Sequence, residues 1–240
     1  EQDPDLCALV EANMATLGLP CSFYRGDASV YLTEMEPASV VYMDPARRNE
    51  HGGRTYGIAD CTPNVLEMRD EMLEKARRVI VKLSPMLDWR KAVGDIGSAY
   101  VRSVHIVSVE NECKELLLVL SKEEYEGSSA LRVVCVNLLS NGQEERFEFD
   151  GSSPVTSPVS PVSYTPQYLF EPNASIMKAG CFQQLAQRFT ADPIGPNSHL
   201  FVSETVREDF PGRRFHIVSI SSMNKRELKE KLSGITMAKD

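Results

Sequence analysis

Two short apolar runs alternate with a segment of helical periodicity in the first half of the chain, and this alternation most constrains the fold. The runs are Ser39–Met43 and Val79–Leu83, and each has the length and bounded character of a strand buried in a parallel sheet. Parallel strands need a crossover between them, which is usually a helix. A helix that starts at Thr62–Pro63 and ends at Arg77 or Arg78 is predicted there. The alternation therefore predicts an α/β fold.

The segment before these runs predicts two more helices and a strand. Pro4–Leu17 carries apolar side chains along one helical face, with Asp3 as a candidate N-cap and Gly18 as a C-terminal stop. A short strand is expected at Cys21–Tyr24 and a short helix at Ala28–Met35.

Two hairpins are predicted further along the chain. Val101–Val109 and Glu115–Leu120 are close enough in sequence to pair, and Leu131–Leu138 and Glu145–Phe149 flank the turn signal Ser140–Gly142. We therefore expect the parallel sheet to end in antiparallel strands.

A proline- and serine-rich segment divides the chain. Gly151–Ser163 reads GSSPVTSPVSPVS, and a proline disfavours helix at the residue before it, so this segment is predicted to be a linker. The expected domains are residues 1–125 as the α/β part, residues 126–163 as hairpin and linker, and residues 164–240 as a small accessory domain.

The accessory domain is predicted to be α+β, with a ferredoxin-like arrangement as one candidate. The expected elements are a helix capped by Asn173 and running through Phe189, strands at Leu200–Val206 and Phe215–Ser221, and a final helix that begins at Asn224 and ends at Leu232.

Composition narrows the location and the class of partner. No run approaches the roughly 20 apolar residues of a membrane span, and the start, EQDPD, lacks the features of a signal peptide. A cytoplasmic protein without membrane attachment is expected. The six cysteines are scattered singly, which favours free thiols over disulfides or a metal site. The four histidines add no metal-binding spacing.

Charge is distributed unevenly along the chain. The net charge is −8, which argues against a surface that coats nucleic acid. Residues 164–240 hold 10 Lys and Arg against 8 Asp and Glu, which leaves 16 against 26 in residues 1–163. The basic segments worth noting, Arg213–Arg214 and Lys225–Lys231, both lie in the C-terminal part, although a solvated helix face is the simpler explanation.

Acidic residues stand at the points where ligands of open α/β sheets bind, which are the carboxyl ends of the strands. Glu1 begins the chain, Gly26–Asp27 follows the first predicted strand, and Asp44-Pro45-Ala46-Arg47 follows Ser39–Met43. Each signal is weak alone, but their order and spacing are informative.

This order resembles class I S-adenosylmethionine-dependent methyltransferases. More specifically, DPARRNEHGGRTYGIADCTPN, then IVKLSPMLDW, and the ending FHIVSISSMNKRELKEKL resemble bacterial methyltransferases with a C-terminal THUMP-like domain. The resemblance implies that Glu1 binds the ribose hydroxyls of the cofactor and Asp27 its adenine amine. It also implies that Asp44, Pro45, Ala46 and Arg47 orient the methyl acceptor, with Asp44 accepting a proton or hydrogen bond.

The chain also departs from the family pattern. The glycine-rich cofactor loop after the first strand has no counterpart. In the family strand order 3-2-1-4-5-7-6, strands 1 and 2 would be missing. We therefore expect a fragment of an enzyme that binds the cofactor poorly by itself. The covalent mechanism of uridine C5-methyltransferases is disfavoured because Lys82-Leu83-Ser84-Pro85 lacks the required cysteine. Cys61 is a weak candidate to replace that nucleophile.

Two functions from different classes follow. The first is a methyltransferase acting on RNA, such as tRNA or rRNA, whose THUMP-like domain positions the substrate through Arg213, Arg214, Lys225 and Arg226. The second is a non-catalytic module that binds RNA or protein on a degenerate methyltransferase fold. The acceptor atom and the oligomeric state stay open.

Overall fold

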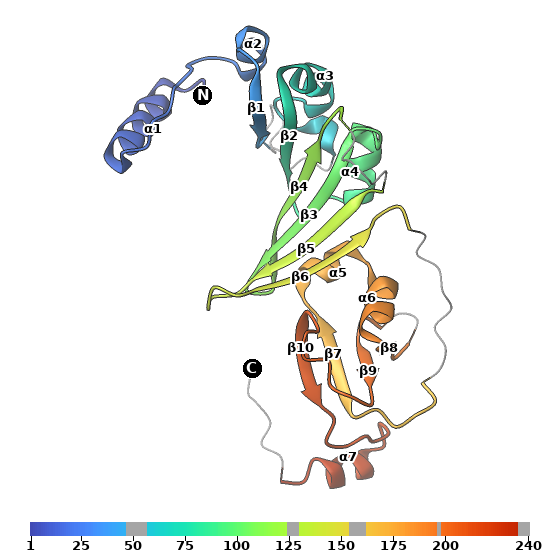
Figure 1. The fold of residues 1–240 in the computed structure, drawn as a ribbon. Helices are drawn as coiled ribbons and strands as arrows, with labels where there is room; N and C mark the ends of the chain where they lie inside the picture. The colour runs from blue at the N-terminus through green and yellow to red at the C-terminus, as the bar shows by residue number, and fades with distance from the viewer. Residues whose placement is uncertain (47–56, 124–129, 154–161, 196–197, 235–240) are drawn as a thin grey trace. The chain divides into compact units, whose positions relative to one another are not determined.

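The computed structural model describes residues 1–46, 57–123, 130–153, 162–195 and 198–234. The chain divides into two compact units, Glu1–Ser153 and Pro154–Asp240. Figure 1 shows the elements of both units along the chain.

The first unit is built on a six-stranded mixed sheet. Its strands are β1 (Ala38–Met43), β2 (Ala76–Leu83), β3 (Val101–Val109), β4 (Glu112–Leu120), β5 (Arg132–Leu138) and β6 (Glu144–Asp150). Their order across the sheet is β1-β2-β4-β3-β5-β6. Because β4 runs antiparallel to both of its neighbours, β1, β2, β3 and β5 all point the same way, while β4 and β6 oppose them. The α/β prediction is confirmed.

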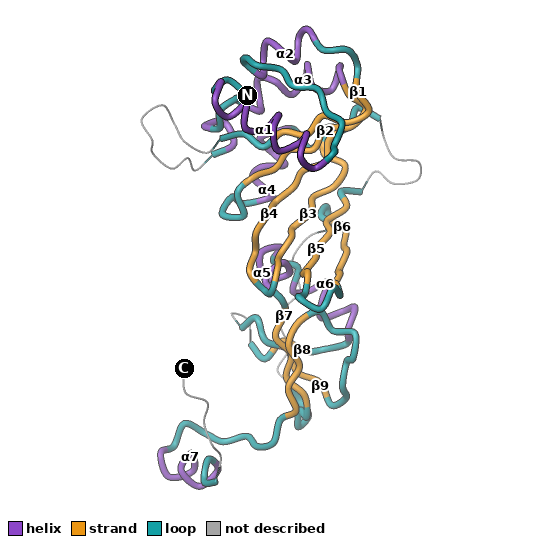
Figure 2. The backbone as a smooth tube through the Cα atoms, turned by 90° about the vertical axis from the view of Figure 1, so that its left-hand side faces the viewer, coloured by secondary structure: helices purple, strands orange, loops and turns teal. Residues whose placement is uncertain are grey.

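Both predicted hairpins form, and the second one extends the first sheet. Glu110 and Asn111 close the β3–β4 turn with φ of 49° and 63°, the left-handed conformation that suits a tight hairpin. Strand β5 pairs with β3 in parallel and β6 closes the sheet, so β3 to β6 lie side by side (Figure 2). The hairpin that the sequence analysis grouped with the linker therefore belongs to the first unit.

Helices of the first unit begin at side-chain caps. Asp3 caps α1 (Pro4–Leu17) and Asp27 caps α2 (Ala28–Glu34), each through two backbone N–H groups. Helix α4 (Trp89–Ile96) was not predicted from the sequence. Its N-cap is Asp88.

The predicted bounds of helix α3 were wrong at both ends. The helix spans Val65–Lys75 and is capped by Asn64, whose Oδ1 accepts from the Leu66 N–H at 3.0 Å. Thr62 is instead held in a bridge with Ala46. At the other end, Ala76 is already extended and opens β2. A 3₁₀ turn at Ile58–Asp60 precedes the helix.

In the half of the sheet formed by β1 and β2, the buried side chains lie mainly on one face. Alternate side chains of β2, Val79, Val81 and Leu83, are almost fully buried, and α3 and α4 pack against the sheet. On β1, by contrast, Val40 and Tyr42 are 46% and 58% exposed. Since neighbouring side chains of a strand point to opposite faces, this half of the sheet has one covered face and one more open face.

The strand predicted at Cys21–Tyr24 is absent, so that prediction was wrong. The segment is irregular, and the Tyr24 carbonyl accepts from the amino group of Glu1 at 3.2 Å. Among the described residues, β1 is the edge strand and pairs with β2 alone. The segment pairs with neither β1 nor any other described strand, and a strand forms only as part of a hydrogen-bonded ladder.

The second unit is α+β, as predicted. Its antiparallel sheet has the order β10-β7-β9-β8, formed by β7 (Tyr168–Pro172), β8 (Asp192–Pro193), β9 (Phe201–Ser203) and β10 (Gly212–His216). Phe170, Phe201 and Phe210 cluster in its core.

Several boundaries in this unit differ from the prediction. The single helix expected through Phe189 is two, α5 (Ala174–Ala179) and α6 (Phe182–Phe189). Gly180 separates them because its left-handed backbone, with φ of 66°, ends α5. Strand β9 is shorter than the predicted Leu200–Val206, and β10 begins before the predicted Phe215–Ser221 and overlaps it only at Phe215 and His216. Helix α7 (Lys225–Lys231) forms at the predicted cap, Asn224.

No helix in the described part of the chain combines the length and the apolar character needed to cross a membrane.

Candidate functional site

Three adjacent strands bring a charged cluster to the carboxyl end of the parallel strands. Asp44 follows the last residue of β1, Lys82 lies near the end of β2, and Glu115 lies in β4. Lys82 Nζ is 2.9 Å from Asp44 Oδ2 and 3.6 Å from Glu115 Oε1. One ammonium group thus lies between two carboxylates.

The environment of this cluster favours the charged form of Lys82. The hydrogen bond to Asp44 raises the pKa of Lys82, and the charges of Glu115 and Asp44 raise it further, against the opposing effect of burial. The Lys82 side chain is 21% exposed. The second oxygen of Glu115, Oε2, is buried without a hydrogen-bond partner. It is an acceptor that could take a donor from a ligand.

The backbone after Asp44 is fixed by a neighbouring segment. Ala46 N–H donates to the Thr62 carbonyl at 2.7 Å, and Thr62 N–H donates to the Ala46 carbonyl at 3.0 Å. The Ala46 carbonyl, which the resemblance implied would orient the acceptor, therefore already accepts one bond. Arg47 and the loop that contains His51 lie outside the described residues.

A small hollow opens beside this cluster. Pro45, Cys61, Lys82 and Ser84 line it, with Cys61 itself buried. A second hollow of about 190 Å³ shares Ser84 with it and reaches the start of α4. The site is therefore a shallow cleft next to the cluster.

The two residues predicted to hold the cofactor lie on adjoining segments. The Glu1 carbonyl accepts from Gly26 N–H at 2.9 Å, and Gln2 Nε2 donates to Asp27 Oδ2 at 2.8 Å. Each carboxylate also closes a local turn. Glu1 accepts from the N–H groups of Gln2 and Asp3, and Asp27 accepts from the Ser29 hydroxyl.

These hydrogen bonds lower the pKa of both acids. The Asp3 N–H has the largest effect on the pKa of Glu1, and the Ser29 hydroxyl has the largest effect on that of Asp27. Both groups are thus held as acceptors. Within the described part of the chain, Asp44 pairs with Lys82 and contacts neither of these acids.

The four basic residues proposed to contact substrate are spread over two elements. Arg213 and Arg214 are neighbours on β10, so they point to opposite faces. Arg213 pairs with Glu171 at 2.6 Å and Arg214 pairs with Glu208 at 2.8 Å. Lys225 and Arg226 are exposed in the first turn of α7.

The chain is similar in fold to a solved protein structure. A solved structure from Porphyromonas gingivalis W83, provisionally assigned as a methyltransferase, matches with a TM-score of 0.84 and 28% sequence identity. The match covers 97% of this chain and 58% of that chain, so the present chain spans little more than half of its structural relative. The fold is therefore methyltransferase-like.

The second unit has its own match. A family model described as a ferredoxin-like domain covers residues 168–211. No curated protein matched the chain in sequence.

The sequence analysis did not assign Lys82 and Glu115 to the site. The available signal was a single cation in the otherwise apolar run VIVKL, near the end of a strand. A charge in such a run needs a partner. The pairing of β2 with β4, which brings Glu115 close, depends on tertiary structure.

Proposed function

We propose that this chain forms the C-terminal part of an S-adenosylmethionine-dependent methyltransferase that acts on RNA. The cofactor-binding glycine loop would belong to a segment before Glu1. The observation that carries the proposal is the position of Asp44 at the carboxyl end of a parallel edge strand, paired with Lys82 at 2.9 Å. Ligands of α/β sheets bind at this end of the strands.

The strand order supports the proposal. In the family order 3-2-1-4-5-7-6, the run 4-5-7-6 has an antiparallel strand 7 between two parallel ones. The run β1-β2-β4-β3 has the same pattern, with β4 antiparallel. The outer edge of β1 would then receive strand 1 of the missing part.

Exposed side chains on β1 agree with such a partner. Val40 and Tyr42 are about half exposed on a strand with an open edge in the described chain. An open apolar edge strand is a liability that proteins usually cover. The 58% coverage of the solved relative leaves ample chain to do so.

The chain's own residues fit part of the cofactor. The Glu1 and Asp27 carboxylates lie on segments joined by hydrogen bonds, and both are acceptors suited to ribose hydroxyls and an adenine amine. S-adenosylmethionine supplies the methyl group when bound.

Asp44 would act on the acceptor. Its carboxylate accepts a hydrogen bond from an acceptor N–H and takes the proton that the new bond releases. Lys82 holds this carboxylate in place, while the Thr62–Ala46 bridge fixes the backbone that follows. Alignment of this kind is the main requirement of an in-line displacement.

The proposal that the substrate is RNA rests on the second unit. Helix α7 carries Lys225, Arg226, Lys229 and Lys231 with two glutamates, and its described residues are unburied. Cations of this kind contact phosphates without regard to sequence.

Calorimetry with S-adenosylmethionine tests the proposal. The longer protein should bind the cofactor, and the present chain should bind it much more weakly. In the longer protein, Asp44→Asn should lower turnover by about 100-fold without weakening cofactor binding. Asp70→Asn, which alters an exposed ion pair with Arg69 on α3, should leave turnover unchanged.

A non-catalytic binding module is the second candidate. The observation that favours it is that Glu1 and Asp27 both already serve local backbone groups. Cofactor binding by neither form of the protein would support this module and contradict the enzyme.

A further inference from the structure

A larger cavity lies at the amino ends of the parallel strands, whereas Asp44 lies at their carboxyl ends. Val101 and Arg132, the first residues of the parallel strands β3 and β5, line it together with the face of α4. Asp44, by contrast, follows the carboxyl end of β1. This cavity is therefore separate from the candidate methyl-transfer site.

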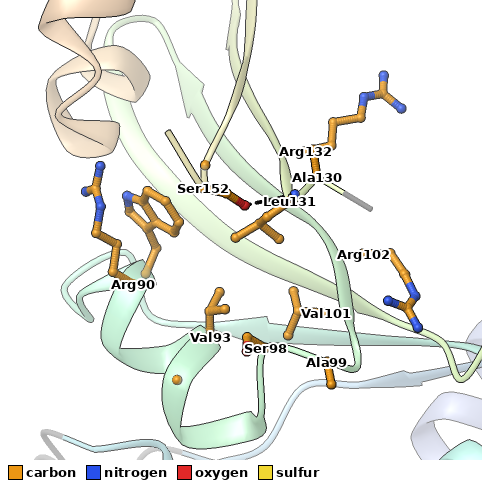
Figure 3. A pocket seen from close by; sticks show the side chains of 13 residues that line it. Arg90, Val93, Ser98, Ala99, Val101, Arg102, Ala130, Leu131, Arg132 and Ser152 are labelled. Carbon is orange, nitrogen blue, oxygen red and sulfur yellow. Dashed lines mark hydrogen bonds between the residues drawn. The ribbon is translucent and has the colours of Figure 1, made fainter. Parts of the chain in front are cut away.

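The cavity combines an apolar floor with a basic rim. Figure 3 shows Val93, Val101 and Leu131 between Arg90 on one side and Arg102 and Arg132 on the other. Its volume is about 700 Å³, within the range of small-molecule sites. Among the described residues that line it, no Asp or Glu occurs. This is unusual in a unit where acidic residues outnumber basic ones by 26 to 16.

The guanidinium groups are held in place by their own contacts. Arg102 donates to the carbonyls of Glu123 and Lys122 at 2.8 and 3.3 Å, which are neutral acceptors, and it forms no ion pair within the described part of the chain. Arg132 donates twice to Glu148, which also pairs with Arg146, so two cations share one carboxylate. The result is a preorganised positive rim.

On the remaining side, Arg90 lies over the ring of Trp89 with its guanidinium carbon 4.2 Å from the ring centroid. A stacked guanidinium keeps its donors in its own plane, beside the ring that it covers. The rim thus presents positive charge on both sides of the apolar floor.

We propose that this cavity binds a nucleotide, with its phosphate on the arginine rim and its base against Val93, Val101 and Leu131. Arginine is well suited to phosphate because its planar donors match the phosphate oxygens. An acyl chain fits less well, since the cavity is open along one side and would leave such a chain in water. The nucleotide could be free or part of an RNA chain.

The single tryptophan of the chain gives a local reporter. Trp89 lines the cavity, and the sequence contains no other tryptophan. Guanosine monophosphate and a short single-stranded RNA should each change its fluorescence in a saturable way. Guanosine is chosen because the cofactor proposed above contains adenosine, so the outcome is independent of methyl transfer.

Matched arginine variants complete the test. Arg102→Gln should weaken binding about tenfold or more, and Arg102→Lys should restore part of it. Lys114→Gln removes the same charge from an exposed residue of β4 outside the cavity and should have no effect. Circular dichroism of each variant establishes that it is folded.

The outcomes separate the possibilities. Binding of both probes supports a free-nucleotide site, and binding of the RNA alone supports a site for a nucleotide within a chain. Equal binding of inorganic phosphate would show a plain anion site and overturn the nucleotide assignment. An unchanged Trp89 signal, or equal weakening by Lys114→Gln, would overturn the site itself.

Discussion

The Lys82 ammonium group lies 2.9 Å from the Asp44 carboxylate, where the ends of β1 and β2 meet. With Glu115 at 3.6 Å on the other side, the cation keeps two carboxylates from facing each other unscreened. This arrangement joins three strands at the point where chemistry is proposed, and it has a measurable pH signature.

Lys82→Met should remove a stabilisation of the folded state that the native protein loses only at alkaline pH. The contacts raise the pKa of Lys82 above its ordinary value of 10.5. A raised pKa means that the stabilisation is complete below 10.5 and is lost as the pH rises through the folded-state value. The free energy of unfolding of the native protein should therefore exceed that of Lys82→Met by about 1 kcal/mol at neutral pH, and the gap should close at alkaline pH. Urea titrations across this range measure it, and a constant gap would contradict the ion pair.

Glu148→Gln should remove a stabilisation of the folded state that the native protein loses at acidic pH. Arg132, the largest influence, and Arg146 lower the pKa of Glu148 from 4.5 to about 2. A depressed pKa gives stabilisation that is present above 4.5 and is lost as the pH falls towards 2. Because this carboxylate is about one third exposed, we expect about 1 kcal/mol after solvent screening.

Acid unfolding followed by circular dichroism tests the Glu148 prediction. The native protein should lose this stabilisation between pH 4.5 and 2, whereas Glu148→Gln should lack it throughout. Glu144→Gln makes the same chemical change at the exposed start of β6 and serves as the control. Parallel acid curves for the native protein and Glu148→Gln would argue against the Arg132–Glu148–Arg146 cluster.

Gly180→Ala should weaken the second unit. The left-handed backbone at Gly180, with φ of 66°, ends α5 and allows α6 to begin. An alanine there costs about 1 kcal/mol because its Cβ crowds the following carbonyl. Gly195→Ala is the matched control, since a Cβ at Gly195 meets open space without a positive φ. Faster amide exchange in α5 and α6 in the first variant alone is the expected result.

The sequence predicted those elements whose signals are local. The cap at Asp3 set the start of α1, and the turns after Val109 and Leu138 set both hairpins, whereas Asp27 was predicted as a cofactor ligand and not as the cap of α2. The strand at Cys21–Tyr24 failed because a strand needs a neighbour, and no local pattern reveals whether one is present. The break at Gly180 was overlooked although a glycine between two helical segments signals it.

In the candidate site too, the residues with a local sequence signal could be predicted and those brought together by the sheet could not. Asp44 and Pro45 could be named because they follow a recognisable strand. Glu115 could not, because its approach to Lys82 depends on the insertion of β4 between β2 and β3. Residues separated by a crossing of this kind meet only through the topology of the sheet.

Helix α1 should be less protected than helix α3. Cys7 is its one buried residue, whereas α3 buries Val65, Met68, Met72 and Leu73. Three leucines of α1, Leu6, Leu9 and Leu17, are 47%, 56% and 67% exposed. Since local opening is opposed mainly by buried apolar contacts, amides of α1 should exchange at least about tenfold faster than those of α3.

Hydrogen exchange followed by mass spectrometry measures the difference between α1 and α3. If the proposed preceding segment completes the sheet beside β1, the exposed leucines of α1 gain a surface to pack on, so protection of α1 should rise in the longer protein while that of α3 changes little. Equal protection of α1 and α3 in the present chain would mean that α1 is already packed. Unchanged α1 protection in the longer protein would mean that the added segment does not cover it, and the proposed completion of the sheet would lose its support from this helix.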